Sequence, residues 1–234
     1  MTDLSRYVPV LQTGRWFAHL PPDFEQALLG MARIRHLQTG EVLFLRDGPP
    51  CGLYALVRGA IRVSGQGGAR HEGREALLVM LEPPSWFGEI SVFDGSARTH
   101  DAHAAESSTV LQVPHEDLLL WLAAHPSHWQ DLAILMADKL RLAFATMEEQ
   151  TVLPAPLRLA RRLVMMAQGY GQANEAAGSR RSLSVTQEQL ALMIGVSRQT
   201  TNAILNDLKD RKLVAVHRGS LEILDLHGLR ALYL

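Results

Sequence analysis

The sequence predicts an α+β chain that begins with an antiparallel β-roll, continues through a long helix and ends in a winged helix-turn-helix. Three observations predict this order. Short apolar runs separated by Gly and Pro fill residues 37–113, a segment without Gly or Pro fills 127–151, and a helix-turn-helix spacing occupies 186–208. We therefore expect three parts, which cover residues 1–126, 127–152 and 153–234.

The roll is predicted from the runs "EVLFL", "LYALV", "EALLVML" and "TVLQVP", which alternate with turn signals such as "DGPPCG" and "SGQGG". Many short strands with Gly and Pro between them are typical of an antiparallel roll or barrel. Helices are expected on either side of the strands. "PPDFEQALLGMARI" at 21–34 has Pro near its start, and "HEDLLLWLAAHP" at 115–126 ends at a Pro.

The long segment 127–151 has two apolar faces. One is a coiled-coil seam at spacings of 4, 3, 4, 3 and 4, formed by Trp129, Ala133, Met136, Leu140, Ala143 and Met147. The other face carries Leu132, Leu135 and Leu142. A single helix packed on its own core is the alternative, but two apolar faces need two partners, which indicates a homodimer. Pro154 and Pro156 then end this helix and begin another, which predicts a hinge.

The segment "TQEQLALMIGVSRQTTNAILNDL" at 186–208 has the spacing of a helix-turn-helix. Thr186 and Gln189 match a capping box, Gly195 suits the tight turn, and Ser197 suits the N-cap of the second helix. Further support comes from the small Ala191 and from the expected core residues Ile194, Ile204 and Leu208. "KLVAVHRGSLEILDL" follows and alternates around "RGS", the pattern of a hairpin or wing.

The charge balance predicts that this C-terminal part binds DNA. Residues 1–152 hold 12 Lys or Arg against 18 Asp or Glu, a net −6, whereas 153–234 hold 11 against 6, a net +5. Arg198 suits guanine, and Gln199 or Asn202 suits adenine, in the major groove. The expected phosphate contacts are Ser197, Thr200, Arg180, Arg181 and Arg218. A purely structural pair of helices with a hairpin is the alternative.

Four stretches resemble the Crp/Fnr family of bacterial transcription regulators: "GEVLF" at 40–44, "DGPPCGLYALVRGAIRV" at 47–63, "FGEISVFDGSART" at 87–99 and "GVSRQTTNAIL" at 195–205. The resemblance covers nearly the whole chain. It implies that the roll is a cyclic-nucleotide-binding-like sensor domain and that RNA polymerase is a partner. A two-fold dimer of such chains would read a palindromic double-stranded DNA site with half-sites about one helical turn apart.

The resemblance also implies an effector site in the segment that begins at Phe87. Glu89 would accept the ribose 2′-hydroxyl and Arg98 would pair with a cyclic phosphate. Thr99 and the backbone N–H groups of Gly88 to Ile90 would complete an anion cradle, on a short helix expected to start at Gly88. Cyclic AMP, cyclic GMP and cyclic di-GMP are the candidate effectors.

Two positions depart from the cAMP-responsive members of the family. The first is their Thr-Ser pair, which contacts adenine and is replaced by two residues here, Ala143 and Phe144. The second is the usual small residue after "RT", which is His100 here. Ala143 and Phe144 are nonetheless the positions expected to lie over a base. A bulky His100 is expected to intrude into the roll.

Several alternatives stay open at this stage. The regulator could keep a vestigial pocket, with Glu89 and Arg98 as a structural ion pair, or could sense haem through His71, His100 or His103. A metal-binding roll enzyme built on "HDAHAAE", with Glu106 as a further ligand, is the remote alternative, because residues 100 and 103 face opposite sides of a strand. The single cysteine, Cys51, excludes an iron-sulfur cluster.

The N-terminus "MTDLSRYVPVLQTGRW" has no apolar signal region. No stretch of the chain approaches the ~20 apolar residues of a membrane span. We therefore expect a cytoplasmic protein.

Overall fold

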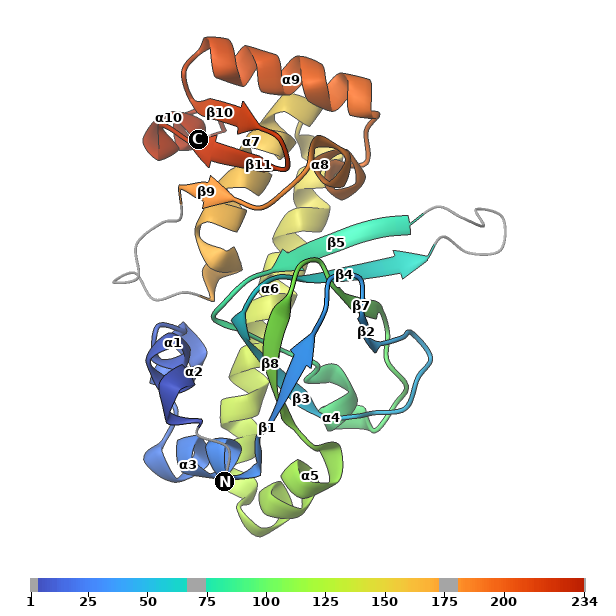
Figure 1. Ribbon diagram of the computed structural model, residues 1–234, viewed down its shortest axis with the longest axis vertical. Helices are drawn as coiled ribbons and strands as arrows, with labels where there is room; N and C mark the ends of the chain where they lie inside the picture. Colours follow the sequence, from blue (N-terminus) through green and yellow to red (C-terminus); the bar gives the residue numbers. More distant parts are fainter. Residues whose placement is uncertain (1–3, 67–74, 173–180, 234) are drawn as a thin grey trace. The chain divides into compact units, whose positions relative to one another are not determined.

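The computed structural model describes residues 4–66, 75–172 and 181–233 (Figure 1). The chain divides into two compact units, each formed from more than one segment. The first unit comprises Met1–Gly65, Leu78–Leu140 and Gln172–Ala177, and the second comprises Gln66–Leu77, Arg141–Gly171 and Gly178–Leu234. Each unit is described separately below.

The roll is built from eight strands in the described residues: β1 (Arg33–Leu37), β2 (Val42–Phe44), β3 (Leu53–Arg58), β4 (Ile61–Gln66), β5 (Glu75–Leu81), β6 (Ser85–Phe87), β7 (Asp101–Ala104) and β8 (Ser108–Val113). They form two four-stranded sheets with the orders β1-β8-β3-β6 and β2-β7-β4-β5. Strand β8 lies between β1 and β3 in the first sheet, and both pairs are antiparallel. The predicted antiparallel roll is confirmed.

Strand β3 contributes to two separate cores because successive side chains of a strand point to opposite faces. Tyr54 and Leu56 are buried among residues of both sheets, inside the roll. Leu53, Ala55 and Val57 are buried in a second core, together with residues of the flanking helices. A strand buried on both faces reads as a continuous apolar run, as "LYALV" does.

The helices of the first unit cover the outer face of the β1-β8-β3-β6 sheet. They are the 3₁₀ turn η1 (Ser5–Tyr7), α1 (Val8–Gln12), α2 (Arg15–Ala18), α3 (Pro22–Met31), α4 (Ile90–Asp94), α5 (His115–Ala124) and the 3₁₀ turn η3 (Pro126–His128). The helix predicted at 21–34 ends at Met31, because Ile34 pairs with Leu111 in the β1–β8 ladder. No periodicity predicted α1 and α2, which are too short to show one.

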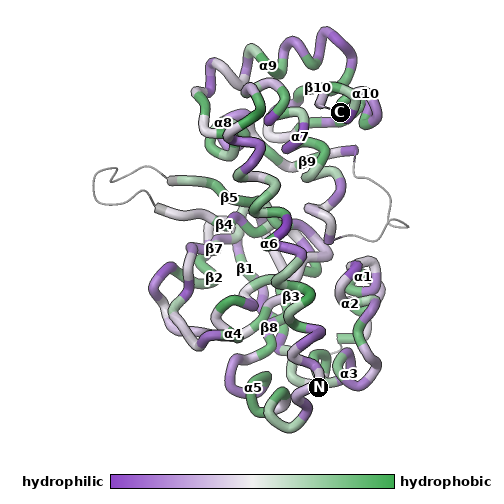
Figure 2. Tube along the Cα trace, turned by 180° about the vertical axis from the view of Figure 1, so that it is seen from behind, coloured by the Kyte–Doolittle hydropathy of each residue, from purple (hydrophilic) through white to green (hydrophobic). Residues whose placement is uncertain are grey.

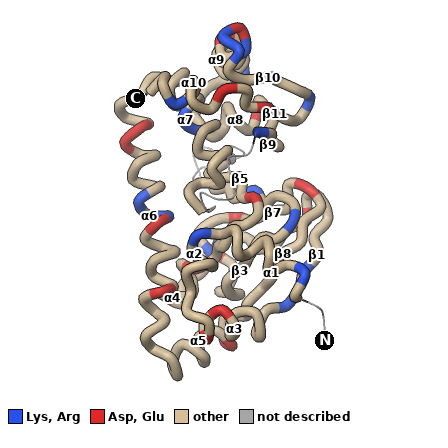
Figure 3. Tube along the Cα trace, turned by 90° about the vertical axis from the view of Figure 1, so that its left-hand side faces the viewer, with Lys and Arg blue, Asp and Glu red and all other residues tan. Residues whose placement is uncertain are grey.

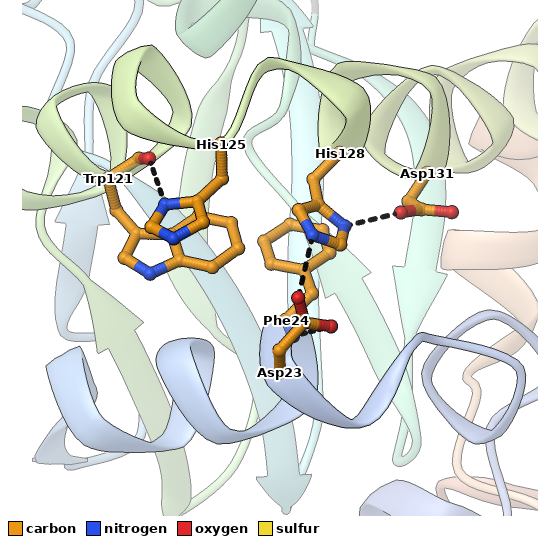
Figure 4. A network of polar contacts seen from close by, with 6 residues as sticks. All are labelled: Asp23, Phe24, Trp121, His125, His128 and Asp131. Atoms are coloured by element: carbon orange, nitrogen blue, oxygen red, sulfur yellow. Dashed lines mark hydrogen bonds and ion pairs between the residues drawn. The ribbon is translucent and has the colours of Figure 1, made fainter.

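A polar network joins α3 to the start of the long helix (Figure 4). The imidazole of His128 lies between two carboxylates, with Nδ1 2.8 Å from Asp131 Oδ2 and Nε2 3.1 Å from Asp23 Oδ2. The His125 ring stacks on Trp121 at 4.2 Å between centroids. This network holds the start of the long helix against α3 within the first unit.

The long helix α6 (Trp129–Val152) has one face in the first unit's core and apolar side chains on another face. Leu132 and Leu135 are buried. Leu140 and Met147 of the predicted seam are more than half exposed, whereas Trp129 is half-buried, 5.4 Å from the Phe93 ring. Figures 2 and 3 show hydrophobic residues and charges of both signs alternating along this helix.

The second unit has the predicted winged helix-turn-helix. Its elements are α7 (Ala155–Ala167), the 3₁₀ turn η4 (Gly169–Gly171), β9 (Ser182–Leu183), α8 (Gln187–Ile194), α9 (Arg198–Asp210), β10 (Val214–His217), β11 (Ser220–Ile223) and α10 (Leu226–Ala231). The hairpin β10–β11 is extended by β9 into a sheet of order β10-β11-β9. Pro154 is the N-cap of α7 and Pro156 lies in its first turn, as the predicted break requires.

Among the described residues, no helix combines the length and the apolar character that a membrane span requires.

Candidate functional site

The first candidate site is the turn that joins β6 to α4 in the roll. Gly88 has φ +94°, a conformation that strains any residue with a side chain, and α4 begins at Ile90 with Glu89 at the N-cap. The helix expected from Gly88 thus starts two residues later, because a positive φ lies outside the helical region. The N-cap carbonyl oxygen of Glu89 accepts the Val92 N–H at 2.9 Å and the Phe93 N–H at 3.3 Å, which closes this short helix.

Arg98 is buried in the turn and is held by backbone carbonyls. Its Nη1 donates to the Gly88 carbonyl oxygen at 2.8 Å, and its Nη2 donates to the Gly52 carbonyl oxygen at 2.6 Å and to Cys51 Sγ at 3.1 Å. The guanidinium carbon lies 4.5 Å from the centroid of the Phe44 ring, a cation–π contact. Arg98 Nε is buried and has no hydrogen-bond partner in the described part of the chain.

Glu89 is paired with a lysine of the long helix. Lys139 Nζ lies 2.6 Å from Glu89 Oε2, and the Glu89 side chain is only 4% exposed. Within the described residues Glu89 and Arg98 make no ion pair with each other, so the structural pair that the vestigial-pocket alternative requires is not formed. Sequence reasoning missed Lys139, because no local pattern links it to a residue 50 positions earlier.

Two glycines keep the backbone close around the guanidinium. A Cβ on Gly88 would lie 2.9 Å from Arg98 Nη1 and from the Gly52 carbonyl oxygen. A Cβ on Gly52, which has φ +124°, would overlap the Val113 carbonyl oxygen. The missing side chains therefore let the Gly52 and Gly88 carbonyl groups lie close enough to accept hydrogen bonds from Arg98.

The other residues predicted for the effector site differ in how far their side chains are exposed. Phe87 is buried in the roll core and stacks on Tyr54 at 5.5 Å, while Ile90 is 42% exposed. Thr99 is exposed, and its Oγ1 lies 2.8 Å from His100 Nδ1. Ala143 and Phe144 belong to the second unit, and both are exposed.

Burial and the neighbouring arginines perturb two histidines of the first unit. Burial, and then Arg46, lowers the pKa of His100, against an opposing effect of Asp101. Burial, and then Arg98, lowers the pKa of His115. Both imidazoles are therefore neutral at pH 7.

The second candidate site is the exposed face of α9. The capping box of Thr186 and Gln189 starts α8, Gly195 ends it with φ +68°, and Ser197 Oγ accepts the Thr200 N–H at 3.0 Å to start α9. Arg198, Gln199 and Thr200 are exposed. Asn202 is half-buried, and its Oδ1 is buried without a partner among the described residues.

The structure brings two predicted DNA contacts together. Arg198 at the start of α9 and Arg218 in the β10–β11 turn line one hollow of about 370 Å³. Arg181 is exposed beside β9, and Arg180 lies outside the described residues. Arg198 and Arg218, which are 20 positions apart in the sequence, thus line the same hollow, together with Glu188.

The histidines of the haem and metal alternatives are not clustered in the described residues. No group of three His, Cys, Asp or Glu side chains there is arranged to hold a metal ion. His103 lies on β7, His100 directly precedes that strand, and His71 falls outside the described residues.

Comparisons with known proteins match the two parts of the chain that hold the candidate sites. Residues 34–125 match the family described as "Cyclic nucleotide-binding domain", and residues 157–232 match "Crp-like helix-turn-helix domain". The "CRP-like cAMP-activated global transcriptional regulator" of Mycobacterium tuberculosis is 29% identical over 213 residues, which are 91% of this chain and 93% of that protein.

Two solved structures show the same fold. FixK2 from Bradyrhizobium japonicum is 18% identical with a TM-score of 0.73, and the match covers 86% of this chain and 96% of that one. The c-di-GMP-responsive regulator CLP of Xanthomonas campestris is 16% identical with a TM-score of 0.67, over 88% of this chain and 100% of that one.

A roll that matches the cyclic nucleotide-binding domain family, followed by a Crp-like helix-turn-helix, defines a DNA-binding transcription regulator. The two matched families together cover well over half of the chain, in the order found in Crp-type regulators. The chain belongs to the Crp/Fnr family of transcription regulators.

Proposed function

We propose that this regulator is controlled by a cyclic nucleotide that binds in the turn between β6 and α4. The cyclic phosphate would lie against Arg98, Thr99 and the N–H groups that follow Gly88, and the ribose 2′-hydroxyl would hydrogen-bond to Glu89. The observation that carries the proposal is the buried guanidinium of Arg98, whose Nε has no partner among the described residues. A phosphate oxygen is a suitable acceptor for such a donor.

The Glu89–Lys139 pair supplies a route from the effector to the dimerisation helix. Lys139 lies on α6, and Glu89 is the only carboxylate paired with it in the described structure. A ribose hydroxyl that hydrogen-bonds to Glu89 would therefore alter this ion pair. A ligand shifts an equilibrium only by its difference in affinity for two states. We infer that the arrangement of α6 in a homodimer is the state that the effector selects.

The dimer would form through the exposed apolar face of α6 and would place two α9 helices on a palindromic DNA site. Arg198, Gln199 and Asn202 would contact bases, and Ser197, Thr200, Arg180, Arg181 and Arg218 would contact phosphates. The seam of Trp129, Ala133, Met136, Leu140, Ala143 and Met147 stays the predicted interface. RNA polymerase is the expected partner on the DNA, and the cytoplasm is the expected compartment.

The effector proposal is tested by calorimetric titration of the full chain with cyclic AMP, cyclic GMP and cyclic di-GMP. We expect binding of at least one of them, and loss of that binding in Arg98→Ala. Arg58→Ala, the same change at an exposed arginine of β3, is the matched control. Thermal unfolding of each variant separates lost binding from lost folding. Absence of heat with all three nucleotides would favour the ligand-independent regulator instead.

A further inference from the structure

His100 occupies a position beside the proposed phosphate site. It follows Thr99 directly and precedes β7, and its Nδ1 lies 2.8 Å from Thr99 Oγ1. On its other side the ring faces Gly65 of β4, where a Cβ would lie 3.6 Å from His100 Cδ2. That distance is an ordinary van der Waals contact, so the imidazole packs closely beside Gly65 and is half-buried against the roll.

Few charged groups act on this ring. Arg46 disfavours its protonation and Asp101 favours it, but burial has the largest effect and lowers the pKa of His100. The carboxylate of Asp101 is itself buried, and its Oδ1 accepts the Arg46 N–H at 2.7 Å. Leu78, the other neighbour near Gly65, is uncharged. A neutral imidazole has one N–H donor and one acceptor nitrogen, so its tautomer decides whether Nδ1 accepts from the Thr99 hydroxyl or donates to it, whereas an imidazolium donates.

We propose that His100 is a proton-linked ligand group, which becomes an imidazolium when the cyclic phosphate binds at Arg98 and Thr99. This inference rests on the proposed function, and it concerns a residue that the resemblance to the family did not assign. A phosphate in contact with Thr99 places a negative charge one hydrogen-bonded residue away from the ring. An anion at that distance favours the protonated ring and offsets the effect of burial and of Arg46.

The coupling fixes the direction of the pH dependence. Because the bound anion raises the pKa of His100 above its value in the free protein, protonation and nucleotide binding strengthen each other equally. The phosphodiester of the nucleotide stays a monoanion over the pH range in which His100 titrates. Affinity is therefore highest below the pKa of His100 in the free protein and falls as the pH rises through its pKa in the complex. The steepest expected change is about tenfold in Kd per pH unit.

The test is calorimetry of the full chain with cyclic AMP and cyclic GMP at pH 6 in two buffers that differ in ionisation enthalpy. For a nucleotide that binds, we expect the heat to depend on the buffer, with uptake of up to about one proton per site. We also expect Kd to decrease several-fold from pH 7.5 to pH 6. A buffer-independent heat with measurable binding would overturn the proposal while leaving the proposed function intact.

Two histidine variants assign the proton. His100→Gln keeps a hydrogen-bonding side chain that does not titrate, so it should lose both the proton uptake and the pH dependence of Kd. His115→Gln is the control. It removes the other histidine whose pKa is lowered, on which Arg98 also acts, and it should keep both the proton uptake and the pH dependence. Proton uptake that survives in His100→Gln would show that another group is responsible. If cyclic AMP, cyclic GMP and cyclic di-GMP all produce no heat at any pH, the proposed function and this inference both fail.

Discussion

The helix-turn-helix and the turn between β6 and α4, where we propose that the effector binds (the effector turn), differ in how far apart their essential residues lie in the sequence. The caps of α8 and α9 and the turn at Gly195 use partners within five residues. In the effector turn, Glu89 pairs with a lysine 50 positions away and Arg98 donates to a carbonyl 46 positions away. A site made of local contacts is readable from one segment, whereas a site made of distant contacts is not.

The two sites also differ in burial. Arg198 and Gln199 project from α9 into solvent, where they are free to meet DNA. Glu89 and Arg98 are each only 3% exposed and have partners inside the protein. Removing the partner of a buried charge lowers the stability of a protein more than removing an exposed charge does. Changes at the effector turn should therefore affect stability, and changes on α9 should affect DNA binding.

The largest expected effect comes from Gly52→Ala, which is compared with the same change at Gly195. Both glycines have a positive φ. Gly52→Ala should destabilise the first unit by about 4 kcal/mol or more, because its Cβ would overlap the Val113 carbonyl oxygen. Gly195→Ala should cost only about 1 to 2 kcal/mol, since a Cβ there meets nothing within 4 Å and only the positive φ is strained.

All four tryptophans lie in the first unit, so denaturant unfolding followed by tryptophan fluorescence reports on Gly52→Ala. Far-ultraviolet circular dichroism reports on both units and is the measurement for Gly195→Ala. Equal losses of stability in the two variants would show that the close contact at Gly52 relaxes at little cost.

Next in size is the loss of the lysine partner of Glu89. Lys139→Met should destabilise the first unit by about 3 kcal/mol, because it leaves a buried carboxylate without its cation. Tryptophan fluorescence during chemical unfolding measures the loss. The double variant Lys139→Met with Glu89→Gln should recover much of the stability, and a double variant as unstable as the single one would mean that packing, not charge, explains the effect.

A smaller effect is expected for DNA recognition. Arg198→Ala should weaken binding to a specific site by about 1 to 3 kcal/mol if the guanidinium contacts a guanine. Titration of labelled DNA, with a site variant at each base pair, measures the loss and its position. Arg211→Ala near the end of α9 is a matched control, since Arg211 is exposed and pairs with Asp207. A loss of equal size on every sequence would assign Arg198 to a phosphate contact instead.

The smallest effect is expected at the capping box. Thr186→Ala removes the acceptor for the Gln189 N–H and should destabilise the second unit by about 1 kcal/mol. Circular dichroism should show the loss, whereas the tryptophan transition of the first unit should not move. A shift of the tryptophan transition of similar size would show that the two units unfold together.

Much of the fold was predictable because its signals are local. The strand runs, the prolines at 154 and 156 and the caps at Thr186 and Ser197 each act within a few residues, and the structure confirms them. The errors lie at boundaries set by tertiary contacts. The helix expected to continue to residue 34 ends at Met31, and the helix expected at Gly88 begins at Ile90.

The sequence by itself determined the order of roll, long helix and winged helix-turn-helix, and it marked Glu89, Arg98 and Arg198 as the residues to examine. The tertiary structure alone decided their surroundings. It placed Lys139 against Glu89, the Gly52 carbonyl against Arg98, and Arg218 beside Arg198 in one hollow. The physical reason is that periodicity and capping depend on neighbours along the chain, whereas the partner of a buried charge depends on which distant segments the core packs together.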